Sequence, residues 1–346
     1  MVAADSSRAL LRMGAIVTTR TPLRVSFFGG GTDLPDYYRR GYGAVVSTTI
    51  DKYVYVTVKP HGALFDEVFR LNYSKTEQAT SVEEIENEIA RESIRLCEMR
   101  GPLYISTVAD VPSGSGLGSS SSFAVGLLHA FHMMNGRGIT PGELAGSASR
   151  IEIDILGKPI GKQDQFAAAY GGLNHFRFNA DERVSITPIS LSPENTDLLF
   201  SSFLLFWTGV SRRAEDILSH QRERSEFNTS TLDSLRDMAD HACDLLHNDK
   251  MSIQKFGKLL NEAWELKRRL SSRISDDQIS NWYRRGIDAG AYGGKLCGAG
   301  GGGFLLFCAP REKHSAIKAA LSDLNNIDVA YDRLGTRVLF PGYTER

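Results

Sequence analysis

A loop rich in glycine and serine carries the strongest chemical pattern in this chain. It reads PSGSGLGSSSS over residues 112–122, between a strand-like segment (LYISTVAD) and an apolar, helix-like segment (FAVGLLHAFHMM). Glycine lets the backbone pass close to a ligand, because it has no Cβ and tolerates positive φ. Serines that open a helix add hydroxyl groups to the unpaired N–H groups there, and together these attract anions. We therefore predict a phosphate-binding loop made by Pro112, Gly114, Ser115, Gly116, Leu117, Gly118, Ser119, Ser120 and Ser121.

Other signatures of phosphate and hydrolase chemistry fit the chain less well. It has no GxxxxGK[ST] string of a Walker A loop, no HRD or DFG string of a protein kinase, and no GxSxG string. The run GAGGGG at 298–303 matches GxGxxG formally, but a dinucleotide-binding loop follows a strand and opens a helix. Here the expected order is helix, glycines, strand, so the run does not indicate a nicotinamide-dependent dehydrogenase.

The elements that must position this loop fall into two bodies. Up to about residue 190 the chain is strand-rich, as in VVSTTI and YVYVTVKP, with an amphipathic helix expected over 81–100 and a helix start at 140–143. After a polar, proline-containing segment at 180–197, LLFSSFLLFW predicts a buried strand. Helices around 231–247, 252–270 and 276–289 follow, then strand FLLFCA, helix AIKAALSDL and a closing strand VLF. This order favours an α+β fold with helices on one sheet face.

Composition limits the classes of partner. The chain has 346 residues, 42% hydrophobic and 23% charged, and its net charge of −1 does not suit a nucleic-acid partner. Its four cysteines lack CxxC pairing, which argues against a disulfide framework or a zinc knuckle. The longest apolar stretch, 198–207, is too short for a membrane span, and the first thirteen residues lack the apolar core of a secretory signal. We expect a cytoplasmic protein without membrane contact, and leave a homodimer open.

Three segments resemble the three motifs of the GHMP kinase superfamily. They are TPLRVSFFGGGTD at 21–33, DVPSGSGLGSSSS at 110–122 and KLCGAGGGG at 295–303, in the family's order. The resemblance implies an α+β, two-domain fold, with a ribosomal S5 domain 2-like N-terminal domain and a ferredoxin-like C-terminal domain. It also implies ATP and Mg²⁺ as cofactors. On this basis we expect a flexible tail at 1–14, an ATP-binding domain at 15–190 and a C-terminal domain at 191–346.

The resemblance also assigns residues to catalysis and metal binding. The segment GKQDQ at 161–165 is similar to the galactokinase segment GIMDQ, which makes Asp164 the proton acceptor for the attacking hydroxyl. Arg24 matches the basic residue that pairs with this aspartate or with the γ-phosphate in sugar-kinase members. Glu152, 12 residues before Asp164, and Ser120 match the Mg²⁺ ligands. Magnesium prefers such hard oxygen donors.

The acceptor is suggested by departures from the galactokinase pattern. Where galactokinase has GEHTD, this chain has GGGTD, so Gly30, Gly31, Thr32 and Asp33 are predicted to contact the substrate, with Asp33 as the best hydroxyl-binding candidate. This form, with IEIDILGKPIGKQDQFAAAYGG, resembles the D-glycero-D-manno-heptose 7-phosphate kinases. That resemblance implies transfer to the C1 hydroxyl, which would feed nucleotide-activated heptose synthesis for capsule or lipopolysaccharide. A kinase for fucose or galactose, or a catalytically silent sugar- and ATP-binding regulator, remains an alternative.

A phosphorylated sugar needs cationic groups at its far end. TGVSRRAEDIL at 208–218 supplies an adjacent arginine pair after a serine, and guanidinium groups bind phosphate bidentately. Two glycines of the third motif are also predicted to contact the substrate. The remaining predicted substrate contacts are therefore Ser211, Arg212, Arg213, Gly300 and Gly301.

Overall fold

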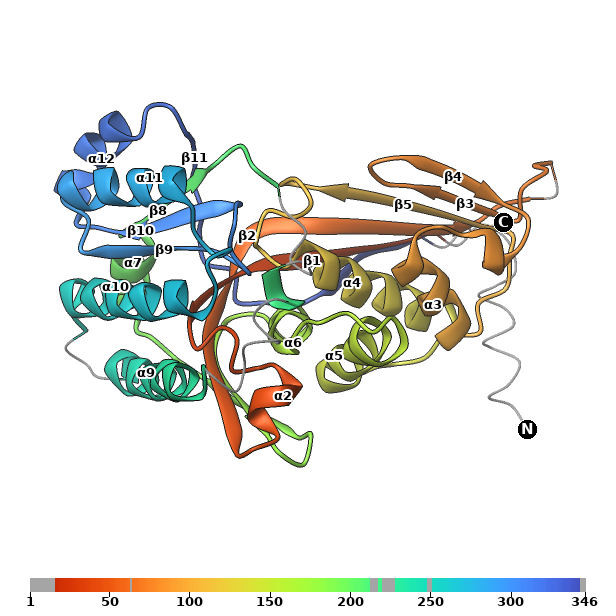
Figure 1. Cartoon of the computed structure of the whole chain (residues 1–346). Helices are drawn as coiled ribbons and strands as arrows, with labels where there is room; N and C mark the ends of the chain where they lie inside the picture. The colour runs from red at the N-terminus through yellow and green to blue at the C-terminus, as the bar shows by residue number, and fades with distance from the viewer. Residues whose placement is uncertain (1–15, 63, 212–216, 220–227, 248–250, 343–346) are drawn as a thin grey trace.

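The computed structural model describes residues 16–62, 64–211, 217–219, 228–247 and 251–342 (Figure 1). The predicted tail at 1–14 lies outside them. The α+β class predicted from the sequence is confirmed, with two sheets that each carry helices. No helix within these ranges is long and apolar enough to cross a membrane.

The first sheet is formed by eight strands of the described chain. Its main path runs in the order β12 (Arg337–Gly342), β1 (Ile16–Phe28), β2 (Tyr42–Pro60), β5 (Leu103–Ala109), β3 (Phe69–Asn72), β4 (Thr76–Ala79). β6 (Leu173–Asn179) pairs with the other half of the long strand β2, and β7 (Val184–Pro188) pairs with β6. All these pairings are antiparallel except β3 with β5.

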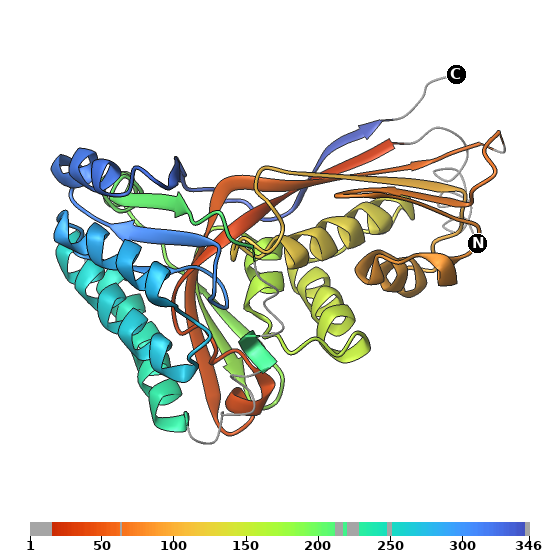
Figure 2. The ribbon, with the colours of Figure 1, turned by 45° about the horizontal axis from the view of Figure 1, so that its top comes forward.

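Helices cover one face of this sheet (Figures 1 and 2). They are α3 (Glu88–Leu96), α4 (Ser119–Met134), α5 (Pro141–Ser149) and α6 (Gln163–Tyr170), and the π-helical segment η2 (Arg150–Ile155) lies between α5 and α6. α4 is apolar because it packs on β1 and β2, and its residues from Ala124 to Leu128 are buried. α5 begins as predicted, with a capping box between Thr140 and Glu143. Two short helical pieces, α2 (Pro35–Tyr38) and η1 (Val82–Glu84), complete this part.

The second sheet has four antiparallel strands among the described residues. Their order is β11 (Asn325–Ile327), β8 (Phe203–Trp207), β10 (Phe304–Cys308), β9 (Gly293–Leu296). The helices with it are α9 (Thr229–His247), α10 (Ile253–Leu270), α11 (Asp277–Asp288) and α12 (His314–Ala320), with the short turn η3 (Arg311–Lys313) before α12. α10 packs on β9 and β10, and α9 packs on α10 and on β2 of the first sheet. Rings of Phe27, Phe203 and Phe256 join the two parts, with centroids 5.2 and 5.3 Å from Phe27.

Three elements differ from the prediction. The amphipathic stretch 81–100 is helical in α3 only from Glu88, because Asn87 caps it by accepting a hydrogen bond from Ala90 N. LLFSSFLLFW is divided, because its first residues end helix α7 (Pro193–Phe200), which Ser192 caps. The closing strand VLF belongs to β12, which pairs with β1 instead of joining the second sheet. The domain boundary at 190/191 stays a proposal, and the last strand lies in the first sheet.

Candidate active site

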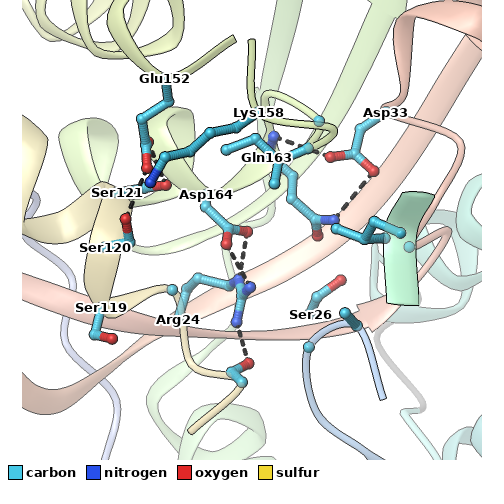
Figure 3. Close-up of a pocket in the computed structure, with 18 of the residues that line it drawn as sticks. Arg24, Ser26, Asp33, Ser119, Ser120, Ser121, Glu152, Lys158, Gln163 and Asp164 are labelled. Carbon is cyan, nitrogen blue, oxygen red and sulfur yellow. Dashed lines mark hydrogen bonds and ion pairs between the residues drawn. The ribbon is translucent and has the colours of Figure 1, made fainter. Parts of the chain in front are cut away.

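A cavity of about 730 Å³ lies where the three glycine-containing segments meet (Figure 3). The segments touch through their backbones, since Arg24 N donates to Leu117 O at 3.0 Å and Phe304 N donates to Ser115 O at 3.2 Å. Gly116 has a φ of +83°, and a Cβ on it would lie 2.5 Å from Cys297 O. No residue but glycine fits there. The three segments therefore line one cavity. Its volume lies within the range of pockets that bind small-molecule ligands.

Arg24 and Asp164 form a bidentate ion pair at the centre of this cavity (Figure 3). Arg24 Nε donates to Asp164 Oδ1 at 2.7 Å, and Arg24 Nη2 donates to Oδ2 at 2.6 Å. The remaining guanidinium nitrogen, Nη1, donates to Gly116 O at 2.6 Å. Arg24 comes from the middle of β1, where it is 5% exposed, whereas the Asp164 side chain is 23% exposed. The arginine is therefore fixed by three bonds, and the carboxylate it holds still faces the cavity.

Helix α4 begins beside this pair. Its N-cap is Gly118, with a φ of +79°, and a Cβ there would lie 3.3 Å from both Arg24 Cγ and Asp164 Oδ2. Glycine permits both the backbone conformation and the close approach. The first serines of α4, Ser119 and Ser120, line the cavity from this end. An anion at this end would meet the helix N-terminus and the serine hydroxyls.

Glu152 lies behind these serines and is fully buried. Ser120 Oγ donates to Glu152 Oε1 at 2.8 Å, and Ser121 Oγ and Gln165 Nε2 each donate to Oε2 at 2.7 Å. Burial raises the pKa of Glu152, while the bonds from Ser121, Ser120 and Gln165 and the charge of Lys158 lower it in part. Figure 3 shows the Lys158 side chain extending toward the carboxylate. A cation here would offset the burial of the charge.

The π-helical turn η2 is what aims Glu152 inward. It continues α5 without a break, and it places Ile151 and Glu152 in the interior while Asp154 is exposed. Widened π-helical turns inside α-helices occur frequently at functional sites.

Asp33 and Gln163 form a second polar group on the other side of Asp164 (Figure 3). Asp33 is 2% exposed and accepts from Gly31 N and Gln163 Nε2 through Oδ1, both at 3.1 Å, and from Gln163 N through Oδ2 at 3.2 Å. Burial and then the nearby charge of Asp164 raise its pKa. Gln163 Oε1 is buried without a hydrogen-bond partner in the described part of the chain. Asp33 thus orients Gln163, whose unpartnered oxygen still has the capacity to accept a hydrogen bond.

The other residues predicted for the site divide between the cavity wall and its supports. Gly30, Gly31, Asp33, Gly114, Gly116, Gly118, the serines 119–121 and the exposed Ser211 line the cavity. Pro112, Ser115, Leu117, Thr32, Gly300 and Gly301 do not. Thr32 is fully buried and ties the turn to β2 through Ala44, and Gly301 N donates to Ile274 O at 2.8 Å. Arg212 and Arg213 lie outside the described residues.

Several cavity residues were not singled out from the sequence. Lys295 and Gln163 belong to segments already quoted, KLCGAGGGG and GKQDQ, so their position beside a motif was an available signal. Ser26 and Lys158 had the same signal, since Ser26 lies in TPLRVSFFGGGTD and Lys158 lies in IEIDILGKPIGKQDQFAAAYGG. Lys267 had none, because it lies among the charged residues of the last turn of α10 and only tertiary packing brings it to the cavity.

Comparison with known proteins agrees with this geometry. Residues 81–172 match the model of the GHMP kinases N terminal domain, and residues 244–327 match that of the GHMP kinases C terminal. A D-glycero-alpha-D-manno-heptose 7-phosphate kinase of Campylobacter jejuni is 30% identical over 339 residues, covering 93% of this chain and 98% of that protein. A galactokinase of Pyrococcus furiosus is 26% identical, over 88% of this chain and 92% of the relative.

Solved structures show the same fold. The crystal structure of a D-glycero-D-manno-heptose 1-phosphate kinase from Bacteroides thetaiotaomicron has a TM-score of 0.77 at 25% identity, covering 95% of this chain and all of the other (100%). Lactococcus lactis galactokinase complexed with galactose has a TM-score of 0.74 at 16% identity, over 98% of this chain and 100% of the other, a likeness of fold alone. The sequence motifs, the domain matches and the fold together place this chain in the GHMP kinase family.

Proposed function

We propose that this chain transfers the γ-phosphoryl group of ATP to the C1 hydroxyl of D-glycero-D-manno-heptose 7-phosphate. The product would be the 1,7-bisphosphate, a precursor for nucleotide-activated heptose in capsule or lipopolysaccharide synthesis. The reaction would take place in the cytoplasm, with Mg²⁺ as the metal.

The observation that carries the proposal is the Asp164–Arg24 pair set between two unlike groups of side chains. On one side lie the α4 N-terminus, Ser120 and Glu152, and on the other lie Asp33 and Gln163 (Figure 3). The first group suits phosphates and a cation, and the second suits hydroxyl groups. A carboxylate between a phosphate site and a hydroxyl site is what phosphoryl transfer to an alcohol requires.

Each residue near the centre has a distinct task. Asp164 orients the acceptor hydroxyl and accepts its proton as the oxygen attacks phosphorus. Arg24 holds that carboxylate in place through two bonds and links it to the phosphate loop at Gly116 O. Gln163 Oε1 accepts from a hydroxyl on the sugar. Since little covalent chemistry falls to the protein in phosphoryl transfer, positioning of this kind supplies most of the catalysis.

A magnesium ion fits the donors present on the phosphate side. Ser120 and Glu152 are hard oxygen ligands in contact with each other, and the buried carboxylate gains from a neighbouring cation. Bound there with phosphate oxygens, the ion would neutralise charge on the transferred group.

The acceptor is proposed from two relatives whose names place the phosphate at different positions of the heptose. One relative is called a heptose 7-phosphate kinase and the other a heptose 1-phosphate kinase. Two glycines, Gly30 and Gly31, line the sugar side of the cavity, where they leave room for a seven-carbon chain.

An ADP-release assay over a panel of acceptors tests the function. The panel contains heptose 7-phosphate, heptose 1-phosphate, free heptose, galactose and fucose, and the product is located by phosphorus NMR. The proposal expects the highest kcat/KM with heptose 7-phosphate and a new phosphate at C1. A higher kcat/KM with galactose or fucose would overturn the heptose assignment, and no ADP release with any sugar would overturn the kinase assignment.

A further inference from the structure

The sugar side of the cavity contains a buried lysine that the proposed chemistry does not use. Lys267, from α10, lines the cavity and is 8% exposed. A Cβ on Gly30 would lie 3.7 Å from Lys267 Nζ and 3.8 Å from Ser26 Oγ. The Lys267 amino group and the Ser26 hydroxyl therefore both lie close to the position that a Gly30 Cβ would occupy. This position is on the side of the cavity where Asp33 and Ser26 lie in Figure 3.

Neither of these side chains is fully partnered by the protein. Lys267 Nζ donates to the carbonyl oxygen of Gly298, and within the described residues it forms no ion pair. Ser26 is 6% exposed, and its buried Oγ has no hydrogen-bond partner in the same part of the chain. A buried ammonium group without a carboxylate is costly, and a buried donor without an acceptor is costly too. Lys267 Nζ has further N–H groups to donate beyond its bond to Gly298 O, and Ser26 Oγ has no partner among the described residues, so both can serve an acceptor on a ligand.

Buried cationic groups near this point favour an anion as that acceptor, and the carboxylates of Asp33 and Asp164 offset their charge only in part. Lys295, 4% exposed, also lines the cavity, and its Nζ donates to the backbone oxygens of Ser26 at 2.6 Å and Phe27 at 3.0 Å. Lys267 and Lys295 thus bring two buried amino groups to the strand that carries Ser26. Burial lowers the pKa of Lys267 to about 8 and that of Lys295 well below its usual value, so an anion would stabilise both ammonium forms.

We propose that Lys267 and Ser26, supported by Lys295, bind the phosphate that the acceptor sugar already carries. This assignment rests on the proposed function, since it concerns the far end of that substrate. The transferred phosphate does not fit this place, because the serines of α4 and Glu152 lie on the opposite side of Asp164 (Figure 3). The subsite would therefore select sugar phosphates over free sugars.

The test compares kcat/KM for heptose 7-phosphate and for free heptose in K267M and S26A. Methionine keeps the unbranched chain of the lysine as far as Cε and removes its amino group and charge. We expect K267M to lower kcat/KM for the sugar phosphate about tenfold or more, because a hydrogen bond to a charged group is lost. The kcat/KM for free heptose and the KM for ATP should each change by less than about twofold. S26A, whose hydroxyl has no partner to lose, should act in the same direction with a smaller effect. K258M, an exposed site on the same helix, is the matched control.

The outcomes separate the subsite from the function. Equal losses with both sugars, or a raised KM for ATP, would overturn the subsite by showing a general role. An unchanged preference in both K267M and S26A would overturn it as well, and loss of preference only in R212M/R213M would move the phosphate to that segment. If the wild-type protein prefers another sugar phosphate and K267M abolishes that preference, the heptose assignment fails while the subsite stands.

Discussion

Asp164 has both carboxylate oxygens bonded to Arg24, and in the proposed reaction it also receives a substrate hydroxyl. Each carboxylate oxygen has two lone-pair positions, and the arginine occupies one on each. The side chain is 23% exposed to the cavity, so the second positions are reachable. The ion pair therefore fixes the geometry of the carboxylate without closing it to the acceptor.

Replacing Asp164 with asparagine tests its role as proton acceptor. D164N keeps the shape of the side chain and one oxygen, and we expect kcat to fall by roughly 10²–10⁴-fold while ATP binding is retained. Steady-state kinetics and calorimetric titration with ATP measure the two effects. D154N, at an exposed position in η2, is the control and should behave as the wild type. Near-normal turnover in D164N would remove this residue from the chemistry.

The predicted metal ligands form a second pair for mutation. E152Q and S120A should each raise the Mg²⁺ concentration needed for half-maximal rate, because each removes one hard oxygen ligand. A Mg²⁺ titration at fixed, saturating ATP and sugar measures this, again with D154N as control. An unchanged Mg²⁺ dependence in both variants would contradict the assignment.

The pH dependence of sugar-phosphate binding should report on Lys267. Its pKa is lowered to about 8 by burial first and by Arg24 next, while Cys297, Asp33 and Asp164 oppose the shift, and Lys295 also lies on this side. As pH rises through about 8 the ammonium loses its proton, so KM for the sugar phosphate should rise, up to about tenfold one unit higher. A phosphate monoester is already dianionic there. KM for ATP, measured in parallel, should not change with pH. In K267M the KM for the sugar phosphate should no longer rise above pH 8.

At the scale of elements, the start of α4 is the most constrained point. G118A places a Cβ 3.3 Å from Arg24 Cγ and Asp164 Oδ2 and forces a side chain into a φ of +79°. We expect a loss of about 1–2 kcal/mol in unfolding free energy and a lower kcat, because the Arg24–Asp164 pair must shift. G146A in α5 has open space around it and should stabilise by about 0.5–1 kcal/mol. Denaturant unfolding and steady-state rates compare the two variants, and equal behaviour would contradict the constraint.

Local sequence predicted the elements near the motifs well and those formed by distant contacts poorly. The loop at 112–122, the capping box at Thr140 and the arginine of β1 are local patterns, and the structure has each where it was expected. LLFSSFLLFW was misassigned in part because an apolar run does not distinguish a helix end from a strand, and Ser192 with Pro193 decided it. Lys267 could not be found, because a lysine in an amphipathic helix is ordinarily a surface residue.

At the scale of the whole molecule, β12 closes the first sheet from the far end of the chain. It pairs with β1, from Ile16 opposite Gly342 to Arg20 opposite Arg337. A chain that ends after Thr336 would leave this edge of β1 unpaired, and exposed edges recruit other strands. We expect a lower melting temperature and concentration-dependent light scattering, whereas a chain that ends after Gly342 should match the full-length protein. An unchanged melting temperature in the shorter chain would show that pairing with β12 does not stabilise β1.

The position of β12 also has a consequence for synthesis on the ribosome. β1 and β2 emerge early, yet the strand that borders β1 is made only after the entire second sheet and its helices. The usual sequence, in which an N-terminal domain folds while the next is being translated, cannot be completed here. The nascent first sheet keeps an unpaired edge on β1 until β12 is made, because the second sheet and its helices lie between these two strands in the sequence. Chaperone dependence should therefore concentrate in the interval between the synthesis of β1 and the synthesis of β12.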